Sequence, residues 1–460
     1  MNSLTPFIQF GKRPVLVLNM LASCLAFLFC LTAGVQAQEV ADTIKVNTRV
    51  VFMDALVKDK RTGVPISDLK AEHFQVLDDG TPRTISYFTR EGQARKPLAL
   101  VLILDLRSDG AGRYLKRPEV LKVVAEELAK LSPQDEVAIL AMDINGEDEK
   151  RLWLSGFTRD PKELVAALAR APQFIDVDPA TADARAGKTT EKNDAGHGSS
   201  ITWGSDSSAK KSSEATEKKN DGSERERTVA EPKPGDAVEV EVVKGKNGAT
   251  VTRTTRRDGS IAVKRTNKDG DVVVDLGDIY DLAAAVKDTT RKAKLERPNS
   301  QLSIVYVSDG INPIFFEDRD ATQELLIHSN AIFNSLTAEM RTLFKLLMPI
   351  AKPIAGTMGI SVYGASKRLA QQTGGEAVKV SRVKDFSTGL SRIIGNLTAR
   401  YSLGFALAED EQDDGRLHNL EVRVKAPDAK GKLRKLEVSS RQGYYMSETQ
   451  PKPETAAKAQ

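Results

Sequence analysis

The stretch that decides the fold is LALVLILDLRSDG, at residues 98–110. A continuous run of apolar, mostly branched residues is typical of a parallel strand that is covered on both faces. The run ends abruptly at Asp105, which places a carboxylate at the mouth of a buried strand. Two interpretations compete: the carboxylate holds a metal ion, or it remains from a site that once held one.

Strands and helices alternate on both sides of this stretch. The pattern predicts an α/β fold with a doubly wound, mostly parallel sheet, whose two halves lie at residues 97–172 and 277–400. The apolar segment 337–359 contains two prolines and receives no assignment. The expected helices lie at 118–131, 161–171, 277–295, 320–328, 361–375 and 383–401, and the expected strands at 98–105, 136–143, 149–157 (an edge strand), 301–310, 330–336 and 376–380.

Segments outside these halves have the short alternating strands of antiparallel structure. Residues 43–96 predict a small β-module, and strands expected at 401–447 pair with it because both flank the same α/β domain. Residues 237–276 predict a β-meander with Asn-Gly and Asp-Gly turns, which projects as an insertion from the α/β domain. The stretches 173–236 and 448–460 are too polar to bury a core, so they are expected to be disordered.

Residues 1–37 have the pattern of a secretory signal peptide. Lys12 and Arg13 precede a long apolar run, and the small residues before Ala37 and at that position suit signal peptidase. Cleavage after Ala37 predicts an extracytoplasmic protein in the periplasm, in the cell envelope or secreted, with membrane contact only if the segment stays uncleaved. Both cysteines, Cys24 and Cys30, lie in this segment, so the mature chain has no disulfide and no cysteine nucleophile.

Composition argues against several classes of function. The chain has 67 basic and 63 acidic residues, and its basic residues are scattered, so nucleic acid is not expected as a partner. The four histidines are isolated along the sequence, which argues against a zinc site. No nucleophile elbow and no phosphate-binding loop occur either, so no catalytic residue is assigned.

A second isolated aspartate follows another buried strand. QLSIVYVSDG, residues 301–310, reaches Asp309 just as LALVLILD reaches Asp105. Doubly wound sheets bind ligands at the carboxyl ends of their strands, where the winding direction switches. The two aspartates are therefore expected to face one crevice, where they could hold a hard divalent cation through oxygen ligands and water.

At these residues the chain resembles the von Willebrand factor type A (VWA) domain, and in particular the acidobacterial VWFA-related exported family. The resemblance rests on TRVVFMDALVKDKRTGVPISDLKAEHFQVLDDGTPRTISYF, PLALVLILD, LSIVYVSDG, YSLGFAL and the closing RQGYY, in that order. It covers nearly the whole mature chain apart from the insert and the meander. It implies a dinucleotide-binding-like fold with a metal-ion-dependent adhesion site, and adhesion or assembly work in the envelope.

The metal site is where the chain departs from this family. The family pattern is Asp-x-Ser-x-Ser after the first strand, a threonine before a later helix and an aspartate after the fourth strand. By position, Asp105 and Asp309 match the two acids, whereas the two serines fall on Arg107 and Asp109. The threonine falls on or beside Gly277, so all three hydroxyl ligands are missing.

Arg107 separates two interpretations of this degenerate site. A guanidinium carries a fixed positive charge and can pair with two carboxylates at once, so the preferred hypothesis is that Arg107 replaces the ion and no cofactor is bound. The alternative keeps Mg²⁺ or Ca²⁺ in the site, with Arg107 swung outward. The ligands of that alternative are Asp105, Asp109 and Asp309, with Ser108 or Asp278 as auxiliaries.

The expected function is non-enzymatic. The chain is interpreted as an exported protein-binding, adhesion or scaffold module that presents the face above the two aspartates to an unknown protein ligand. A metal-dependent hydrolase that uses Asp105 and Asp309 is one alternative, disfavoured because no nucleophile or positioned base accompanies them. The other alternative makes the α/β domain purely structural and assigns binding to the insertion at 173–276.

Overall fold

The structure is a computed structural model of the chain. It describes residues 49–446, apart from 91–95, 108–110, 144–150, 175–236, 257–259, 339–341 and 412. The predicted signal peptide, nearly all of the predicted disordered insert and the predicted tail lie outside the described residues. Within the described ranges, no helix combines the length and the apolar character needed to span a lipid bilayer.

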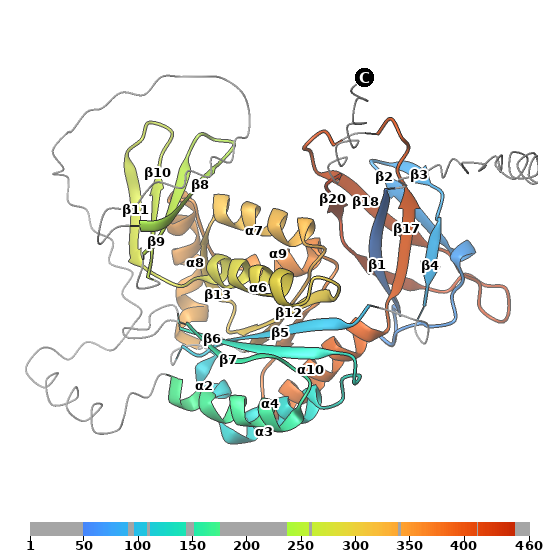
Figure 1. The fold of residues 1–460 in the computed structure, drawn as a ribbon, viewed down its shortest axis with the longest axis horizontal. Helices are drawn as coiled ribbons and strands as arrows, with labels where there is room; N and C mark the ends of the chain where they lie inside the picture. The colour runs from blue at the N-terminus through green and yellow to red at the C-terminus, as the bar shows by residue number, and fades with distance from the viewer. Residues whose placement is uncertain are drawn as a thin grey trace, which may run out of the picture. The chain divides into compact units, whose positions relative to one another are not determined.

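A six-stranded, mostly parallel sheet forms the centre of the α/β fold (Figure 1). Its strands are β5 (Leu98–Asp105), β6 (Glu136–Met142), β7 (Arg151–Thr158), β12 (Gln301–Ser308), β14 (Ile332–Ala338) and β16 (Ala377–Val380). The order across the sheet is β16-β14-β12-β5-β6-β7, and the edge strand β7 alone is antiparallel to its neighbour. Because the chain fills the sheet outward from β5 on one side and from β12 on the other, the winding direction switches between these two strands.

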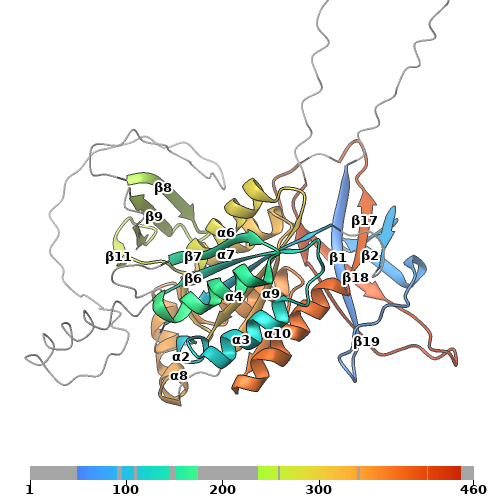
Figure 2. The same cartoon turned by 60° about the horizontal axis from the view of Figure 1, so that its bottom comes forward.

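Helices cover both faces of this sheet (Figure 2). One face carries α3 (Pro118–Leu128), α4 (Pro161–Arg170) and α10 (Val383–Thr398). The other carries α6 (Leu282–Glu296), α7 (Phe316–His328) and α9 (Ala365–Gln372). Leu100 and Leu102 of β5 belong to the first core, whereas Val101 and Ile103 belong to the second. Successive residues of a strand point to opposite faces, which explains why all of β5 is apolar up to its last residue.

Two antiparallel sheets are built from both ends of the described chain. Their strands are β1 (Val50–Asp59), β2 (Phe74–Asp78), β3 (Thr81–Arg83), β4 (Tyr87–Thr89), β17 (Tyr401–Ala406), β18 (His418–Val424), β19 (Leu436–Ser440) and β20 (Gly443–Tyr444). The orders are β19-β1-β17-β4 and β20-β18-β2-β3, so the first strands of the chain pair with the last. Both sheets enclose one apolar core that includes Met53, Val76 and Leu403.

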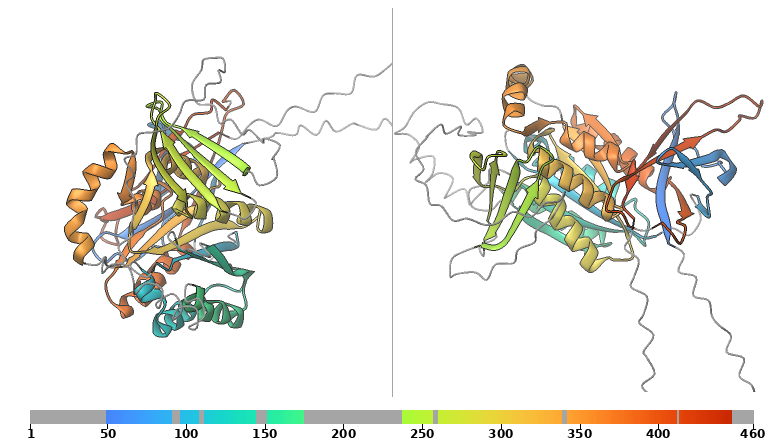
Figure 3. Two further views of the ribbon diagram at one scale, coloured as in Figure 1. Left: turned by 90° about the vertical axis from the view of Figure 1, so that its left-hand side faces the viewer. Right: turned by 90° about the horizontal axis from the view of Figure 1, so that it is seen from above.

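An antiparallel meander adds a further sheet (Figure 3). Its strands are β8 (Ala237–Lys244), β9 (Thr250–Arg256), β10 (Ile261–Thr266) and β11 (Val272–Asp278). The turns include Gly248 and Gly270 at positive φ, a conformation that glycine adopts without strain. Val251, Ile261 and Val263 join the core beneath α6 and α7, so the meander packs on the α/β domain and does not project freely from it.

The region after Asp309 differs from the prediction. The helix expected at 361–375 is shorter, because Ile360–Tyr363 forms strand β15 and α9 begins only at Ala365. Gly364, at φ +89°, makes the turn between them. β15 pairs with β13 (Ile311–Phe315), a strand that the sequence did not predict.

Two other helices differ from what the sequence pattern predicted. The unassigned segment 337–359 contains α8 (Thr342–Thr357), with Pro349 and Pro353 inside it. The two prolines are four residues apart and so remove donors on one side of the helix. The helix expected at 277–295 begins only at Leu282, because the meander extends to Asp278. Short turns of helix lie at η1 (Ala71–His73), α2 (Gly112–Leu115) and η2 (Ala171–Phe174).

Candidate functional site

Two predicted site acids lie at the carboxyl edge of the sheet. Asp105 is the last residue of β5 and Asp309 directly follows β12, and their side chains are 1% and 2% exposed. These strands are parallel neighbours, with Leu104 opposite Val307, so their carboxyl ends lie together. The acids therefore meet at the point where the winding direction of the sheet switches.

The guanidinium of Arg107 lies between the two carboxylates. Its Nη2 donates to Asp105 Oδ2 at 2.8 Å and to Asp309 Oδ1 at 2.9 Å. Its Nε donates to Asp105 Oδ1 at 3.0 Å, so the pair with this carboxylate is two-pronged. Arg107 thus points inward to the acids and not outward to solvent, and only 7% of its side chain is exposed.

Backbone groups complete the network around this ion pair. Nη2 of Arg107 also donates to the carbonyl oxygen of Ile311 at 2.7 Å. The backbone N–H of Arg107 donates to Asp105 Oδ1 at 3.2 Å, and that of Ile311 to Asp309 Oδ1 at 3.0 Å. Each aspartate therefore accepts from the backbone two residues further on, a local turn that orients the carboxylate.

Electrostatics keep Arg107 charged. Burial by itself would lower the pKa of Arg107, but the negative charges of Asp105 and Asp309 outweigh burial and raise this pKa well above its usual value. Burial also raises the pKa of the nearby Tyr306 hydroxyl well above its usual value, and the charge of Asp105 adds to the effect. Tyr306 therefore stays protonated and acts as a hydrogen-bond donor, not as a base.

The polar groups beside the acids hold the loop after β12. Ser308 Oγ accepts from the backbone N–H of Gly310 at 3.0 Å and from Asn312 Nδ2 at 3.2 Å. The Tyr306 hydroxyl donates to Asn312 Oδ1. The hydroxyls of Tyr306 and Ser308 are thus engaged in structural hydrogen bonds. In the described part of the chain these contacts provide no pair of nucleophile and base.

The remaining predicted site residues are not brought into this cluster by the described structure. Ser108 and Asp109 lie outside the described residues. Asp278 ends β11, where its backbone pairs with Ala262 of β10, and its side chain is not described. Gly277 has φ +60°, a left-handed backbone conformation that favours glycine over the threonine of the family pattern.

Sequence reasoning missed a second buried ion-pair cluster, which joins the meander to the α/β domain. Arg253 of β9 donates from Nη2 to Asp281 at 3.0 Å and to Asp318 of α7 at 2.7 Å. Arg265 of β10 donates from Nη2 to Glu317 Oε1 at 3.0 Å. Asp281 also caps α6 by accepting from Ala284 N at 3.0 Å, and an aspartate just before a helical pattern was the one local signal available.

The negative charge of one carboxylate in this cluster is poorly compensated. Burial raises the pKa of Asp318 to about 6, although the charge of Arg253 opposes the shift, and the charge of Asp281 adds to it. One guanidinium thus serves two buried carboxylates, and the second carboxylate ionises at a cost.

The structure brings one histidine close to acids, although the histidines are isolated along the sequence. His418, Asp78 and Asp79 offer ligand atoms within 4.8 Å of one another. Both ring nitrogens of His418 already contact carboxylates, since Nδ1 lies 3.1 Å from Asp79 and Nε2 lies 3.1 Å from Asp414. Arg83 pairs with Asp78 at 2.8 Å, so a cation here would compete with a guanidinium.

An apolar stripe lies exposed on α8. Leu346, Ile350 and Ile354 are 73%, 64% and 51% exposed, and they recur every four residues, which places them on one side of the helix. α8 leads into β15, which pairs with β13, and Ile311 of β13 accepts from Arg107. Chain connectivity and strand pairing therefore link α8, which carries the stripe, to the edge of the sheet where Asp105 and Asp309 lie.

Comparisons with known proteins find structural neighbours, and these are distant. No model of a protein family matches the chain, and no curated protein matches it. The VWA domain of SpRpn10 has 7% sequence identity and a TM-score of 0.28, over 64% of this chain and 94% of that one. The pilus adhesin SpaC from Lactobacillus rhamnosus GG, in its open conformation, has 7% identity and a TM-score of 0.29 over 83% of this chain. The chain spans about half of the adhesin, 48% of its length.

Proposed function

We propose that the chain is a non-enzymatic, VWA-type protein-binding or scaffold module, whose metal site is replaced by the internal ion pair of Arg107. The observation that carries the proposal is the position of this guanidinium, 2.8 Å from Asp105 and 2.9 Å from Asp309. The module acts outside the cytoplasm, after removal of the signal peptide predicted at residues 1–37, and its ligand is a protein of the envelope or of the cell exterior.

Charge supports a site without a metal ion. A divalent cation on the same two carboxylates would lie at contact distance from a fixed positive charge, a repulsion of several kcal/mol even at an effective dielectric constant of about 20. To bind the ion, Arg107 would have to leave three acceptor groups, namely the two carboxylates and the carbonyl oxygen of Ile311. Buried charges that lose their partners are costly. The arrangement in which Arg107 pairs with both carboxylates is therefore favoured over one in which a metal ion takes its place.

The apolar stripe of α8 supports protein binding. Soluble proteins rarely leave a row of large apolar side chains uncovered unless another molecule covers it. The spacing of Leu346, Ile350 and Ile354 matches the way an amphipathic helix docks into a groove of a partner. Recognition would then rest on apolar burial instead of a metal bridge.

Pulldowns from envelope extracts with the full mature chain test this function. We expect a partner that the wild type retains with and without chelator, and that Ile350→Asp loses. Leu295→Asp is the matched control, because Leu295 is also an exposed leucine on a helix (77% exposed) but lies on α6. Equal retention by all three proteins, or release by chelator, contradicts the proposal.

A panel of esterase, protease and phosphatase substrates tests the non-enzymatic part. We expect no turnover above background with or without Mg²⁺. Metal-dependent turnover that disappears in Asp105→Ala would instead assign a hydrolase to the site.

A further inference from the structure

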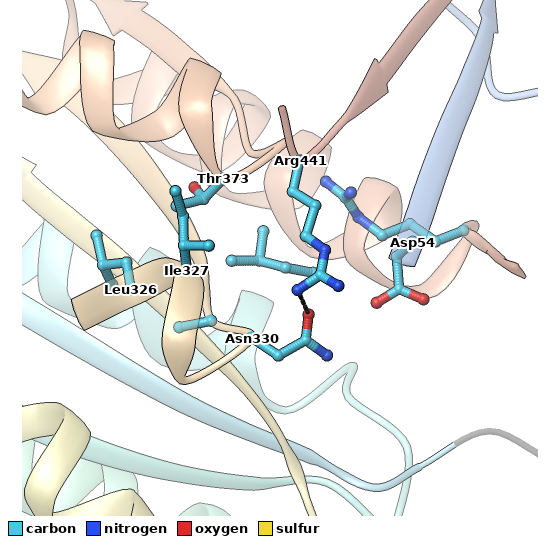
Figure 4. Close-up of a pocket in the computed structure, with 9 residues that line it drawn as sticks. Asp54, Leu326, Ile327, Asn330, Thr373 and Arg441 are labelled. Atoms are coloured by element: carbon cyan, nitrogen blue, oxygen red, sulfur yellow. Dashed lines mark hydrogen bonds between the residues drawn. The ribbon is translucent and has the colours of Figure 1, made fainter. Parts of the chain in front are cut away.

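A small hollow lies between β1, the end of α7 and the segments around Arg400 and Arg441 (Figure 4). Its apolar wall includes Leu326 and Ile327, and its polar lining includes Asp54 of β1 and both arginines. Figure 4 shows Arg441 reaching in from above, with its guanidinium bonded to Asn330 and facing the side on which Asp54 lies. Two guanidiniums thus share one hollow with one carboxylate.

Arg400 is buried with most of its hydrogen-bonding capacity unused. It is 9% exposed, and its Nη2 donates to the carbonyl oxygen of Gly374 at 2.7 Å. Its Nε and Nη1 have no hydrogen-bond partner among the described residues. Burial lowers the pKa of Arg400 from its usual value despite the negative charges of Asp54 and Glu376, which indicates incomplete compensation.

Arg441 repeats this imbalance in the same hollow. Its Nη1 donates to Asn330 Oδ1 at 3.0 Å and its Nη2 donates to the carbonyl oxygen of Phe52. Its Nε is buried without a partner in the described chain. Burial lowers the pKa of Arg441 to about 10, so the side chain remains cationic at neutral pH.

The local acids do not neutralise the two arginines. Asp54 Oδ1 accepts from the hydroxyl of Ser402 at 2.6 Å, and no ion pair between Asp54 and either arginine is present in the described residues. Glu376 is already bonded to Lys58 and Asn396 and to Arg392 at 3.1 Å. The hollow therefore holds two positive charges against one negative charge, an excess of one.

The backbone holds the arginines in this arrangement. Thr373 and Arg441 form an isolated β-bridge, and Gly374 follows at φ +75°. A Cβ at Gly374 would lie 2.5 Å from the backbone carbon of Ser440, so only glycine permits this close approach. The carbonyl oxygen that accepts from Arg400 and the backbone of Arg441 are thus fixed by the same contact.

We propose that the hollow is a binding site for one small, singly charged anion of the size of chloride. Buried guanidinium nitrogens without partners are rare, and an anion supplies both the missing acceptor and the missing charge. Water supplies the acceptor but not the charge. A dianion would overcompensate an excess of one positive charge, and acetate is larger than the space that the hollow offers.

Thermal unfolding of the full mature chain tests the site. Chloride replaces gluconate or acetate, two larger anions, at constant ionic strength. We expect the midpoint of the wild type to rise with chloride concentration and to level off, as for a ligand of the folded state. We expect no rise with Arg400→Met or Arg441→Met. Arg423→Met, which removes an exposed arginine of β18, is the control and should respond like the wild type.

Three outcomes overturn the proposal. A wild type that responds equally to all three anions, or variants that rise as the wild type does, would show a general salt effect. Because the arginine variants can fail to fold, wild-type crystals soaked in bromide provide a second measurement. An anomalous peak within hydrogen-bond distance of Arg400 or Arg441 supports the site, and an empty hollow at saturating bromide rejects it.

Discussion

Arg107 donates to Asp309 at 2.9 Å, although 202 residues separate them along the chain. The same nitrogen donates to Asp105 at 2.8 Å, so one guanidinium joins the two halves of the α/β fold at the carboxyl edge of the sheet. In this position a positive side chain occupies the space between two acids that the family resemblance assigns to a metal ion. The first two predictions follow from this arrangement.

The wild type should bind no divalent cation with appreciable affinity. The positive charge of Arg107 opposes a second cation on the same carboxylates. Isothermal calorimetry of the mature protein with Mg²⁺, Ca²⁺ and Mn²⁺ should therefore give no saturable heat. A clear micromolar isotherm would show that Arg107 leaves the acids when metal is present.

Arg107→Ser should destabilise the fold by roughly 3–5 kcal/mol, because it leaves two buried carboxylates without their partner. It should also make the chain responsive to Mg²⁺, which restores part of the loss by binding the vacated acids. Urea unfolding with and without Mg²⁺ measures both effects. Arg107→Lys is the matched control: it keeps the charge, so Mg²⁺ should not stabilise it. A serine variant that is indifferent to Mg²⁺ contradicts the prediction.

Arg253→Met should destabilise the chain by roughly 3–5 kcal/mol, because Asp281 and Asp318 then remain buried and unpaired. Chemical denaturation gives the free energy of unfolding. Arg256→Met, at the exposed end of the same strand, should change it by no more than about 0.5 kcal/mol. Similar losses of unfolding free energy in both variants would mean that the buried ion pair does not anchor the meander to the α/β domain.

Asp318→Asn should change how stability depends on pH. The pKa of Asp318 is about 6 in the folded chain against an ordinary value of 3.8, so between these values the folded state holds a proton that the unfolded state releases. The wild type therefore loses stability as pH rises through this window, and the asparagine variant should gain relative to it, by at most about 3 kcal/mol. Denaturation at pH values from about 4 to about 7 measures the difference. Asp320 is an exposed neighbour, so the free energy of unfolding of Asp320→Asn should depend on pH as that of the wild type does. The same pH dependence in Asp318→Asn would contradict the shifted pKa of Asp318.

Much of the central sheet was predictable because buried strands carry a strong local signal. The runs at 98–104 and 304–307 are apolar without interruption, as strands covered on both faces require. The stretch at 361–375 was predicted as one helix because its first residues do not distinguish a short strand from the start of a helix. Only the pairing of β15 with β13 decides that question.

The segment that contains α8 was unpredictable for a different reason. Pro349 and Pro353 lower helix propensity, and no local rule says that two missing donors on one side are tolerable. The exposed apolar stripe was equally invisible, because exposure depends on what packs against the helix.

By itself, the sequence determined that two aspartates follow buried strands and that an arginine stands where a hydroxyl ligand is usual. These facts are local, since periodicity and composition set where a strand ends. Only the tertiary structure decided that Arg107 turns inward and that Arg253 pairs with two acids at the starts of two different helices. It also decided that Arg400 and Arg441 line one hollow. A long cationic side chain has many rotamers, and the choice among them depends on charges that distant segments bring within about 3 Å.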